Sequence, residues 1–343
     1  MRVLVTGSNG YIGSVLMPLL VTEGHEVIGI DSDLYAGCTY GPVFPNFSFM
    51  KKDIRDIDLS DLKGYDAVIH LAALSNDPLS DLNPRLTFDI NHEASVRLAR
   101  LAKASGVKRF LFSSSCSTYG ASGDSMLNEE APFNPVTPYG TTKVLVEKDV
   151  AALADGSFSP TFLRNATAYG VSPRMRFDLV INNLIAWAFA SGLVYLKSDG
   201  TPWRPVVHVE DIARAFVTIL HAPMETVHNQ AFNIGSNEEN YQILELAKIV
   251  ESTVPGCRIE FAKDAGPDKR CYRVDFGKFH STFPEHQPKW VVRSGAIDIF
   301  QSYKKNGIRQ EDFEGPRYKR IDHIKQLIST GRLDKSLRWI AWQ

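Results

Sequence analysis

The sequence predicts an α/β fold built on a doubly wound parallel sheet, with a smaller discontinuous lobe toward the C-terminus. In the first half of the 343 residues, apolar strand-like runs alternate with helical stretches. After about residue 160 the alternation loosens and Pro and Gly interrupt it more often. Strands that alternate with helices pair in parallel through right-handed crossovers, which leaves a ligand crevice at the carboxyl ends of the strands.

The order of the elements defines two units. Strands are expected at 2–6, 26–31, 67–72, 109–114, 161–164 and 230–234, and helices at 11–24, 85–105 and 139–155. We therefore expect a Rossmann-type domain over 1–165 plus 205–235 and a substrate-binding lobe over 166–204 plus 236–343. The tail, 312–342, is charged and amphipathic, which predicts a pair of surface helices whose basic residues face solvent.

Composition and charge narrow the class of protein. Lys and Arg total 38 against 39 Asp and Glu, for a net charge of −1, so nothing favours a nucleic acid or membrane partner. The 4 cysteines show no CxxC pair or zinc spacing, which predicts no metal site and a reducing compartment. No charged leader with an apolar core precedes strand 2–6, and the apolar runs are too short to span a bilayer. We expect a cytoplasmic protein.

A glycine-rich loop lies between the first strand and the first helix. Gly7, Gly10 and Gly13 are spaced so that the first permits a tight turn, the second lets the backbone approach a pyrophosphate, and the third lets helix and strand pack closely. Tyr11 and Ile12 begin the helix, whose free N–H groups attract phosphate. The loop predicts a dinucleotide site.

Asp31 identifies the dinucleotide as NAD. It ends the second strand, where a carboxylate can accept both hydroxyl groups of the adenosine ribose and would repel a 2′-phosphate. No Arg or Lys occurs between Arg2 and Lys51 to bind such a phosphate. Asp53 and Ile54 lie between strands 26–31 and 67–72, at the end of a further expected strand, where an acidic side chain meets the adenine amine or else is a helix cap or a solvated charge.

Tyr139 and Lys143 are four residues apart at the start of a predicted helix, so their side chains share one face. A lysine cation beside a phenol lowers the tyrosine pKa from about 10 toward neutral pH, which makes Tyr139 a usable general base or acid. Ser115 lies at the carboxyl end of strand 109–114, where its hydroxyl can share the proton of the reacting oxygen. The sequence thus predicts a redox site, with caps in a turn as the alternative role of the serines.

These motifs together resemble the extended short-chain dehydrogenase/reductase family, and within it the nucleotide-sugar epimerases and dehydratases. The resemblance covers roughly residues 1–275 and rests on the TGxxGxxG loop, the acidic strand end, His70-Leu71-Ala72-Ala73, Asn91, the Ser113–Ser115 run and YxxxK. It implies that Leu71, Ala72 and Ala73 line the NAD site and that Asn91 braces the central strand and cofactor. It also implies a homodimer formed through helices near 92–105 and 142–155.

Two residues after Ser115 bear on the reaction. The 4,6-dehydratases of this group carry an Asp-Glu pair where this chain has Cys116 and Ser117, and a serine cannot remove a C5 proton as a glutamate does. Cys116 is either an unusual acid or base or a small buried hydrophobic residue. This departure argues against an ordinary dehydratase.

The resemblance also points to substrate contacts. It implies that Arg204 binds a nucleotide diphosphate through its planar fork, that Asn183 meets the same group, and that Arg270, or alternatively Arg273, is a second phosphate ligand. Thr167 stands where an Asn commonly contacts the sugar, and Asn165 replaces a common aromatic near the cofactor. These substitutions leave the sugar open.

The function expected from these residues is NAD-dependent epimerisation of a nucleotide sugar, at C4, through a 4-keto sugar. A 4-keto-sugar reductase, or a dehydratase using Cys116, is the alternative enzyme. A non-catalytic dinucleotide-sensing protein on the same fold is the alternative outside enzymes, and it would be expected to lose the Tyr139–Lys143 pair, which this chain keeps.

Overall fold

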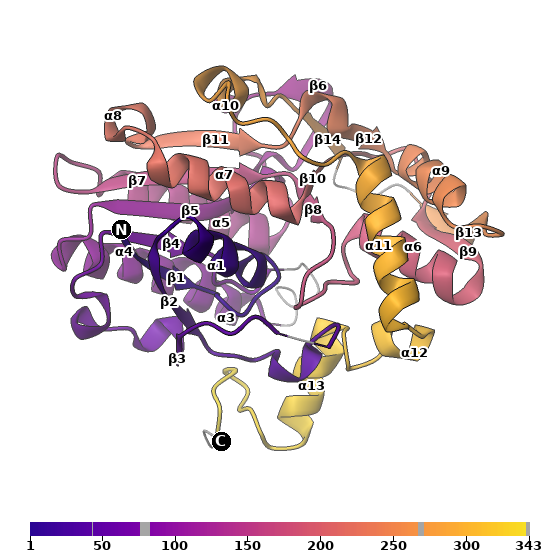
Figure 1. Ribbon diagram of the computed structural model, residues 1–343, viewed down its shortest axis with the longest axis horizontal. Helices are drawn as coiled ribbons and strands as arrows, with labels where there is room; N and C mark the ends of the chain where they lie inside the picture. Colours follow the sequence, from indigo (N-terminus) through magenta and orange to yellow (C-terminus); the bar gives the residue numbers. More distant parts are fainter. Residues whose placement is uncertain (43, 76–82, 267–270, 341–343) are drawn as a thin grey trace.

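A parallel sheet forms the centre of the molecule (Figure 1). The computed structural model describes residues 1–42, 44–75, 83–266 and 271–340. The 7-stranded sheet has the order β11-β7-β5-β4-β1-β2-β3 and every pairing in it is parallel. Its strands are β1 (Arg2–Thr6), β2 (Glu26–Asp31), β3 (Phe49–Lys51), β4 (Ala67–His70), β5 (Arg109–Ser115), β7 (Ser159–Asn165) and β11 (Gln230–Ile234). The predicted doubly wound fold is confirmed.

Helices cover both faces of this sheet because successive strand residues point to opposite sides. Val3 and Val5 pack in one apolar core with α1 (Gly13–Thr22) and α7 (Val209–His221). Leu4, between them, packs in a second core with α4 (Ala94–Ala104) and α5 (Pro138–Ala151). Both faces are therefore buried, as the continuous apolar strands require.

Two predicted elements differ in detail from those observed. Strand 67–72 ends at His70, and the next residues turn across the carboxyl end of the sheet. Helix 85–105 consists of α3 (Pro84–Phe88), a π-helical turn (Asp89–Glu93) and α4. π-turns occur mostly as local bulges and often at functional sites, and this one carries Asn91.

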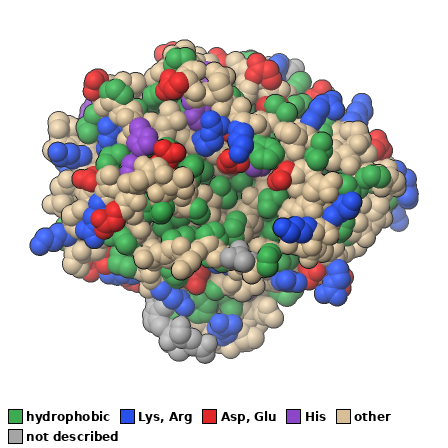
Figure 2. All heavy atoms as spheres, in the orientation of Figure 1, with side chains coloured by type: hydrophobic (Ala, Val, Ile, Leu, Met, Phe, Trp, Pro, Cys, Tyr) green, Lys and Arg blue, Asp and Glu red, His purple; other side chains and the backbone are tan. Residues whose placement is uncertain are grey.

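The second lobe lies beside the carboxyl end of the sheet and has its own core around α6, α9 and α11 (Figure 1). Its elements are β8 (Thr167–Tyr169), α6 (Val180–Ser191), β9 (Leu193–Ser198), β10 (Trp203–His208), β12 (Asn240–Gln242), α9 (Ile243–Thr253), β13 (Arg258–Gly266), α11 (Val292–Asn306) and α12 (Gln310–Phe313). The remaining elements are α8 (Met224–Val227), β6 (Ala121–Leu127), its partner β14 (Cys271–Val274), and α10 (Gly277–Thr282). Figure 2 shows acidic and basic side chains interspersed over the face in view.

The C-terminal tail differs from its prediction. Instead of a helix pair, it contains the end of the four-residue α12 and one ten-residue helix, α13 (Arg320–Ser329), which is followed by a turn. Ile324, Leu327 and Leu337 are buried in the same core as Leu4 of the central sheet. Residues 320–340 therefore pack with the Rossmann domain, although the predicted boundary placed them in the other lobe.

Candidate active site

One large cavity opens where the carboxyl end of the sheet meets the second lobe. Its volume is about 930 Å³. The predicted site residues on its wall are Gly7, Gly10, Tyr11, Ile12, Gly13, Asp31, Asp53, Ile54, Leu71, Ala72, Ala73, Ser115, Ser117, Tyr139, Lys143, Asn165, Thr167, Asn183 and Arg204. The fold thus gathers segments far apart in sequence around one space.

The glycine loop forms a backbone cradle at one end of this cavity. Gly7 has φ +73°, and its N–H donates to the carbonyl of Ile30 at 2.8 Å. A Cβ on Gly7 would lie 2.7 Å from the backbone N of Ala72, and one on Gly13 would lie 2.3 Å from the carbonyl oxygen of Gly7. A side chain at either position would collide with the backbone, so only glycine permits this compact loop, whose form fits the close approach of a dinucleotide pyrophosphate.

Asp31 closes the adenosine end of the cradle. Its two carboxylate oxygens accept N–H groups of Asn9 (2.9 Å) and Asp33 (2.7 Å). Burial nevertheless raises the pKa of Asp31 to about 6. Each carboxylate oxygen can accept a further hydrogen bond, and Asp31 lines the cavity, which fits the predicted acceptance of two ribose hydroxyls.

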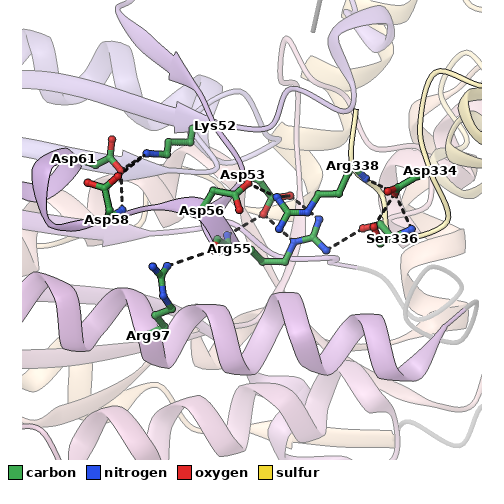
Figure 3. Close-up of polar contacts among 10 residues, drawn as sticks. All are labelled: Lys52, Asp53, Arg55, Asp56, Asp58, Asp61, Arg97, Asp334, Ser336 and Arg338. Atoms are coloured by element: carbon green, nitrogen blue, oxygen red, sulfur yellow. Dashed lines mark hydrogen bonds and ion pairs between the residues drawn. The ribbon is translucent and has the colours of Figure 1, made fainter. Parts of the chain in front are cut away.

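Asp53 takes the alternative role, that of a cap. It accepts the N–H of Arg55 at 2.9 Å and pairs with the Arg55 guanidinium at 2.6 Å (Figure 3). Burial by itself raises the pKa of Asp53, but the bonds and charge of Arg55 outweigh it and hold this pKa below its usual range. Its neighbour Ile54 is 6% exposed and presents an apolar side to the cavity.

Tyr139 and Lys143 lie on one face of α5, as their spacing predicts. Thr137 caps the helix by accepting the N–H of Gly140 at 3.2 Å, and Pro138 occupies its first turn. The Lys143 ammonium lies 5.5 Å from the centre of the Tyr139 ring and donates to the carbonyl of Ser113 at 2.6 Å. Burial lowers the pKa of Lys143 to about 7, against a smaller opposing effect of Glu147. This lysine can therefore change its charge near neutral pH beside the phenol.

The three residues after Ser114 separate into two environments. Ser115 Oγ accepts the N–H of Ser117 at 3.1 Å, and both side chains line the cavity. The buried hydroxyl of Ser117 has no hydrogen-bond partner among the described residues. Cys116 is 0% exposed, donates to the carbonyl of Arg164 at 3.1 Å and lies outside the cavity wall. Burial raises the pKa of its thiol well above the usual range, so the hypothesis of Cys116 as a catalytic acid or base gives way to its alternative, a small core residue.

Two asparagines hold the backbone around the cofactor site. Asn91 accepts the N–H of Leu74 at 2.8 Å and donates to its carbonyl at 3.0 Å. It is 2% exposed and braces the loop after β4 from behind, without lining the cavity. Asn165 donates to Ser113 Oγ at 3.1 Å, and its side-chain oxygen has no partner among the described residues. That oxygen is a buried acceptor of a residue that lines the cavity.

The predicted substrate residues lie on the lobe side of the cavity. Asn183 donates to the carbonyl of Phe177 at 2.8 Å, and Arg204 lies 5.7 Å from the centre of the Tyr272 ring. Thr167 lines the same wall. Arg270 falls outside the described residues. The guanidinium carbon of Arg273 lies 4.6 Å from the centre of the Trp203 ring, and Arg273 does not line the cavity.

Several residues in and behind the cavity wall were not predicted. Arg176 pairs with Asp178 at 2.6 Å and donates to Ser75 at 3.2 Å, and Arg320 of α13 lines the same wall. Neither belongs to a spaced motif, so the sequence carried no signal for them. Glu147, which pairs with Arg164 at 2.7 Å and accepts from Ser114, could have been found because it lies four residues beyond Lys143 on the same helical face.

Comparison with known proteins assigns the family. The model of the NAD dependent epimerase/dehydratase family matches residues 3–235. The UDP-glucose 4-epimerase of Lactobacillus helveticus is 35% identical over 272 residues, which cover 73% of this chain and 82% of that protein. Among the residues that the structure describes, no helix is long and apolar enough to cross a membrane.

Solved structures agree with this assignment. The UDP-glucuronic acid 4-epimerase of Bacillus cereus, in complex with UDP-glucuronic acid and NAD, superposes with a TM-score of 0.75 at 26% identity and covers 89% of this chain and 99% of its own. The UDP-glucose 4-epimerase of Thermotoga maritima, with UDP-glucose, gives a TM-score of 0.77 at 25% identity with the same coverage. The predicted Rossmann fold, the NAD cofactor and an enzyme of the extended, epimerase-type group are confirmed, and the chain belongs to the NAD dependent epimerase/dehydratase family.

Proposed function

We propose that this enzyme inverts the C4 centre of a uridine-diphosphate sugar. The observation that carries the proposal is the meeting of Tyr139, Lys143 and Ser115 in the cavity that also contains the glycine cradle. Cys116 and Ser117 occupy the positions of a dehydratase Asp-Glu pair, and the buried Cys116 cannot reach a sugar there. The relatives named as 4-epimerases support the same reaction.

Bound NAD supplies the acceptor and later the donor of a hydride. Tyr139, as phenolate, takes the proton of the 4-hydroxyl group, and the protonated Lys143 stabilises that phenolate. Ser115 Oγ shares a hydrogen bond with the reacting oxygen. After the 4-keto sugar has rotated within the cavity to present its opposite face, Tyr139 returns the proton to the oxygen, which now lies on the inverted centre. A cavity of about 930 Å³ has the volume of a site for a large ligand.

Asn183 and Arg204 fit the diphosphate of the substrate. Both line the lobe side of the cavity, across from the glycine cradle. An Arg fork binds phosphate oxygens in pairs, and an amide N–H adds a neutral donor. Thr167, which offers one hydroxyl to the sugar, lies between these residues and Tyr139 in our proposal. We further propose a cytoplasmic homodimer that associates through α4 and α5.

The test of the proposed function is a panel of UDP-sugars with the enzyme and NAD, followed by proton NMR and mass spectrometry. We expect interconversion of C4 epimers at unchanged mass without net consumption of NADH. Tyr139→Phe should lower kcat by about 10²–10⁴-fold, the usual worth of a general acid–base, while NAD binding is kept. Tyr65→Phe is the matched control because Tyr65 precedes β4, at the amino end of the strands, and does not line the cavity. Loss of water, oxidation of NADH, or full turnover by Tyr139→Phe would each refute the proposal.

A further inference from the structure

The C-terminal segment, residues 320–340, carries groups toward the cavity that the proposed function leaves unexplained. Arg320, at the start of α13, is 8% exposed and lines the cavity. Its Nη2 has no hydrogen-bond partner among the described residues, and no carboxylate there forms an ion pair with it. A buried cation that has no ion pair within the described part of the chain is costly, so its position favours a nearby anion.

The neighbours of Arg320 locate that anion. Its guanidinium carbon lies 4.3 Å from the centre of the Tyr35 ring, in the loop after β2, and its Nη1 donates to Ser75 Oγ at 3.4 Å, in the loop after β4. These two loops flank the loop after β1 that carries Gly7, because β2 and β4 are the two neighbours of β1 in the sheet. Arg320 therefore lies where the loops after β2 and β4 meet at the cavity, on either side of the loop that carries Gly7.

A second arginine lies beside Arg320. Arg176 donates to the same Ser75 hydroxyl at 3.2 Å and pairs with Asp178 at 2.6 Å. Burial, and then the charge of Arg176, lower the pKa of Arg320 from its ordinary value. Among the residues that the structure describes, these two arginines have one ion-paired carboxylate, an arrangement that suits a diphosphate lying on the cradle.

The same segment closes the adenosine end of the cavity. Leu337 is 4% exposed and lines the wall, in a turn with φ +58°. Arg338 pairs with Asp56 and approaches Asp53 at 3.9 Å, while Arg55 donates to the carbonyl of Ser336 at 2.9 Å (Figure 3).

A second hydrogen bond joins the tail to the residue that follows Asp31. The indole N–H of Trp339 donates to the carbonyl of Ser32 at 2.7 Å. The tail is thus fastened on both sides of Leu337, to the two segments that carry Asp31 and Asp53.

We propose that residues 320–340 complete the NAD site, with Arg320 binding the cofactor diphosphate and Leu337 covering the adenosine. The inference rests on NAD as the cofactor and is independent of which sugar the enzyme converts. It makes the tail a clasp, defined as residues 320–340, that must open before NAD leaves.

The test of the diphosphate contact is Arg320→Met, which keeps the length of the side chain and removes its charge. With NAD-stripped protein, calorimetry should show an NAD Kd raised about tenfold to a hundredfold, the worth of a charge-assisted hydrogen bond. The Kd for UDP should stay within about twofold. Lys325→Met, an exposed lysine of the same helix, is the matched control and should change neither value. An unchanged NAD Kd, or a loss confined to UDP binding, would overturn the assignment.

Hydrogen exchange tests the clasp without any substitution. Adding NAD to the full chain should slow amide exchange over 332–340 at least severalfold, because closure over bound cofactor suppresses local opening. Adding UDP alone should leave that exchange unchanged. If NAD protects only the glycine loop and not 332–340, the tail is not part of the site. Both readouts report binding, so they remain informative even if epimerase activity is not found.

Discussion

At the scale of single residues, burial decides which predicted groups are available for chemistry. Asp31 is partly buried and lines the cavity, so its raised pKa acts directly on ligand binding. Cys116 is buried behind the wall, so its raised pKa makes it inert. Both residues stand at the carboxyl ends of strands in the sequence, and only the packing around them separates their roles.

NAD affinity should depend on pH through Asp31. Because its pKa is raised to about 6 in the free enzyme, Asp31 is ionised at pH 7 and mostly protonated at pH 5, where it loses acceptor capacity for the ribose hydroxyls. We expect the NAD Kd to rise about tenfold between pH 7 and pH 5, as the binding-competent fraction falls. Calorimetry on NAD-stripped protein measures it.

Asp31→Asn is the control for this dependence. It should bind NAD more weakly at pH 7 and show a nearly flat Kd between pH 7 and pH 5. A dependence of wild-type size in Asp31→Asn would assign the titration to another group.

The residues that could be predicted are those whose role is set by near neighbours in the chain. Gly7, Gly13 and the Tyr139–Lys143 pair are defined by spacings of a few residues, and the structure places all of them on the cavity wall. Arg176 and Arg320 reach the cavity only because distant segments fold back on it. Their partners, Ser75 and Tyr35, have no fixed spacing from them in the sequence.

At the scale of elements, α5 carries a column of groups from the cavity into the core. Tyr139, Lys143 and Glu147 follow at intervals of four on one helical face. Glu147 ends the column in a buried pair with Arg164, whose Nη1 also donates to the Tyr119 hydroxyl at 3.0 Å. The helix therefore couples the reacting phenol to the polar core of the sheet.

Glu147→Gln should lower both stability and turnover. Removing one charge of a buried pair leaves the other uncompensated and costs about 3–5 kcal/mol. The Glu147 charge also raises the pKa of Lys143 against the effect of burial, so its loss lowers that pKa further and leaves less protonated Lys143 at pH 7. Urea unfolding and kcat at pH 6 and pH 8 measure the two effects.

Asp149→Asn, the same chemical change at an exposed position of α5, should cost less than about 1 kcal/mol. Equal unfolding midpoints for the two variants would contradict the importance of the buried pair. A kcat of Glu147→Gln that matches the wild type at both pH values would show that the column does not reach Lys143.

At the scale of the whole molecule, the parallel sheet could be predicted because each strand is a continuous apolar run between helices. The position of the tail could not. Its charged, amphipathic pattern is the same whether Ile324 and Leu327 pack on the lobe or on the sheet, and only the assembled surface below β2 and β3 decides between them. The boundary between the two units is therefore a property of tertiary packing.

Neutral histidines lie where the two units meet. His208, at the end of β10, stacks on Trp290 with ring centres 4.3 Å apart, and His286 bonds to Thr218 of α7 at 2.8 Å. Burial lowers the pKa of both to about 4, and it lowers that of His70, inside the sheet, to about 3. Each must take up a proton when the protein unfolds in mild acid.

The enzyme should therefore lose stability as the pH falls from about 6.5 toward 4. In that window the unfolded histidines bind protons that the folded ones do not, so the free energy of unfolding rises with pH and decreases in acid. Each histidine contributes on the order of 1–2 kcal/mol between pH 7 and pH 5, and the raised pKa of Asp31 acts in the opposite sense between about 3.8 and 6. Urea unfolding of NAD-free protein at pH 7 and pH 5 measures the sum of these effects.

His286→Gln tests the contribution of one histidine, because glutamine keeps a donor and an acceptor toward Thr218 but does not titrate. Between pH 7 and pH 5 the wild type should lose more free energy of unfolding than this variant, by on the order of 1–2 kcal/mol. An identical pH dependence of stability in His286→Gln and wild type would show that the destabilising protons bind to groups other than His286.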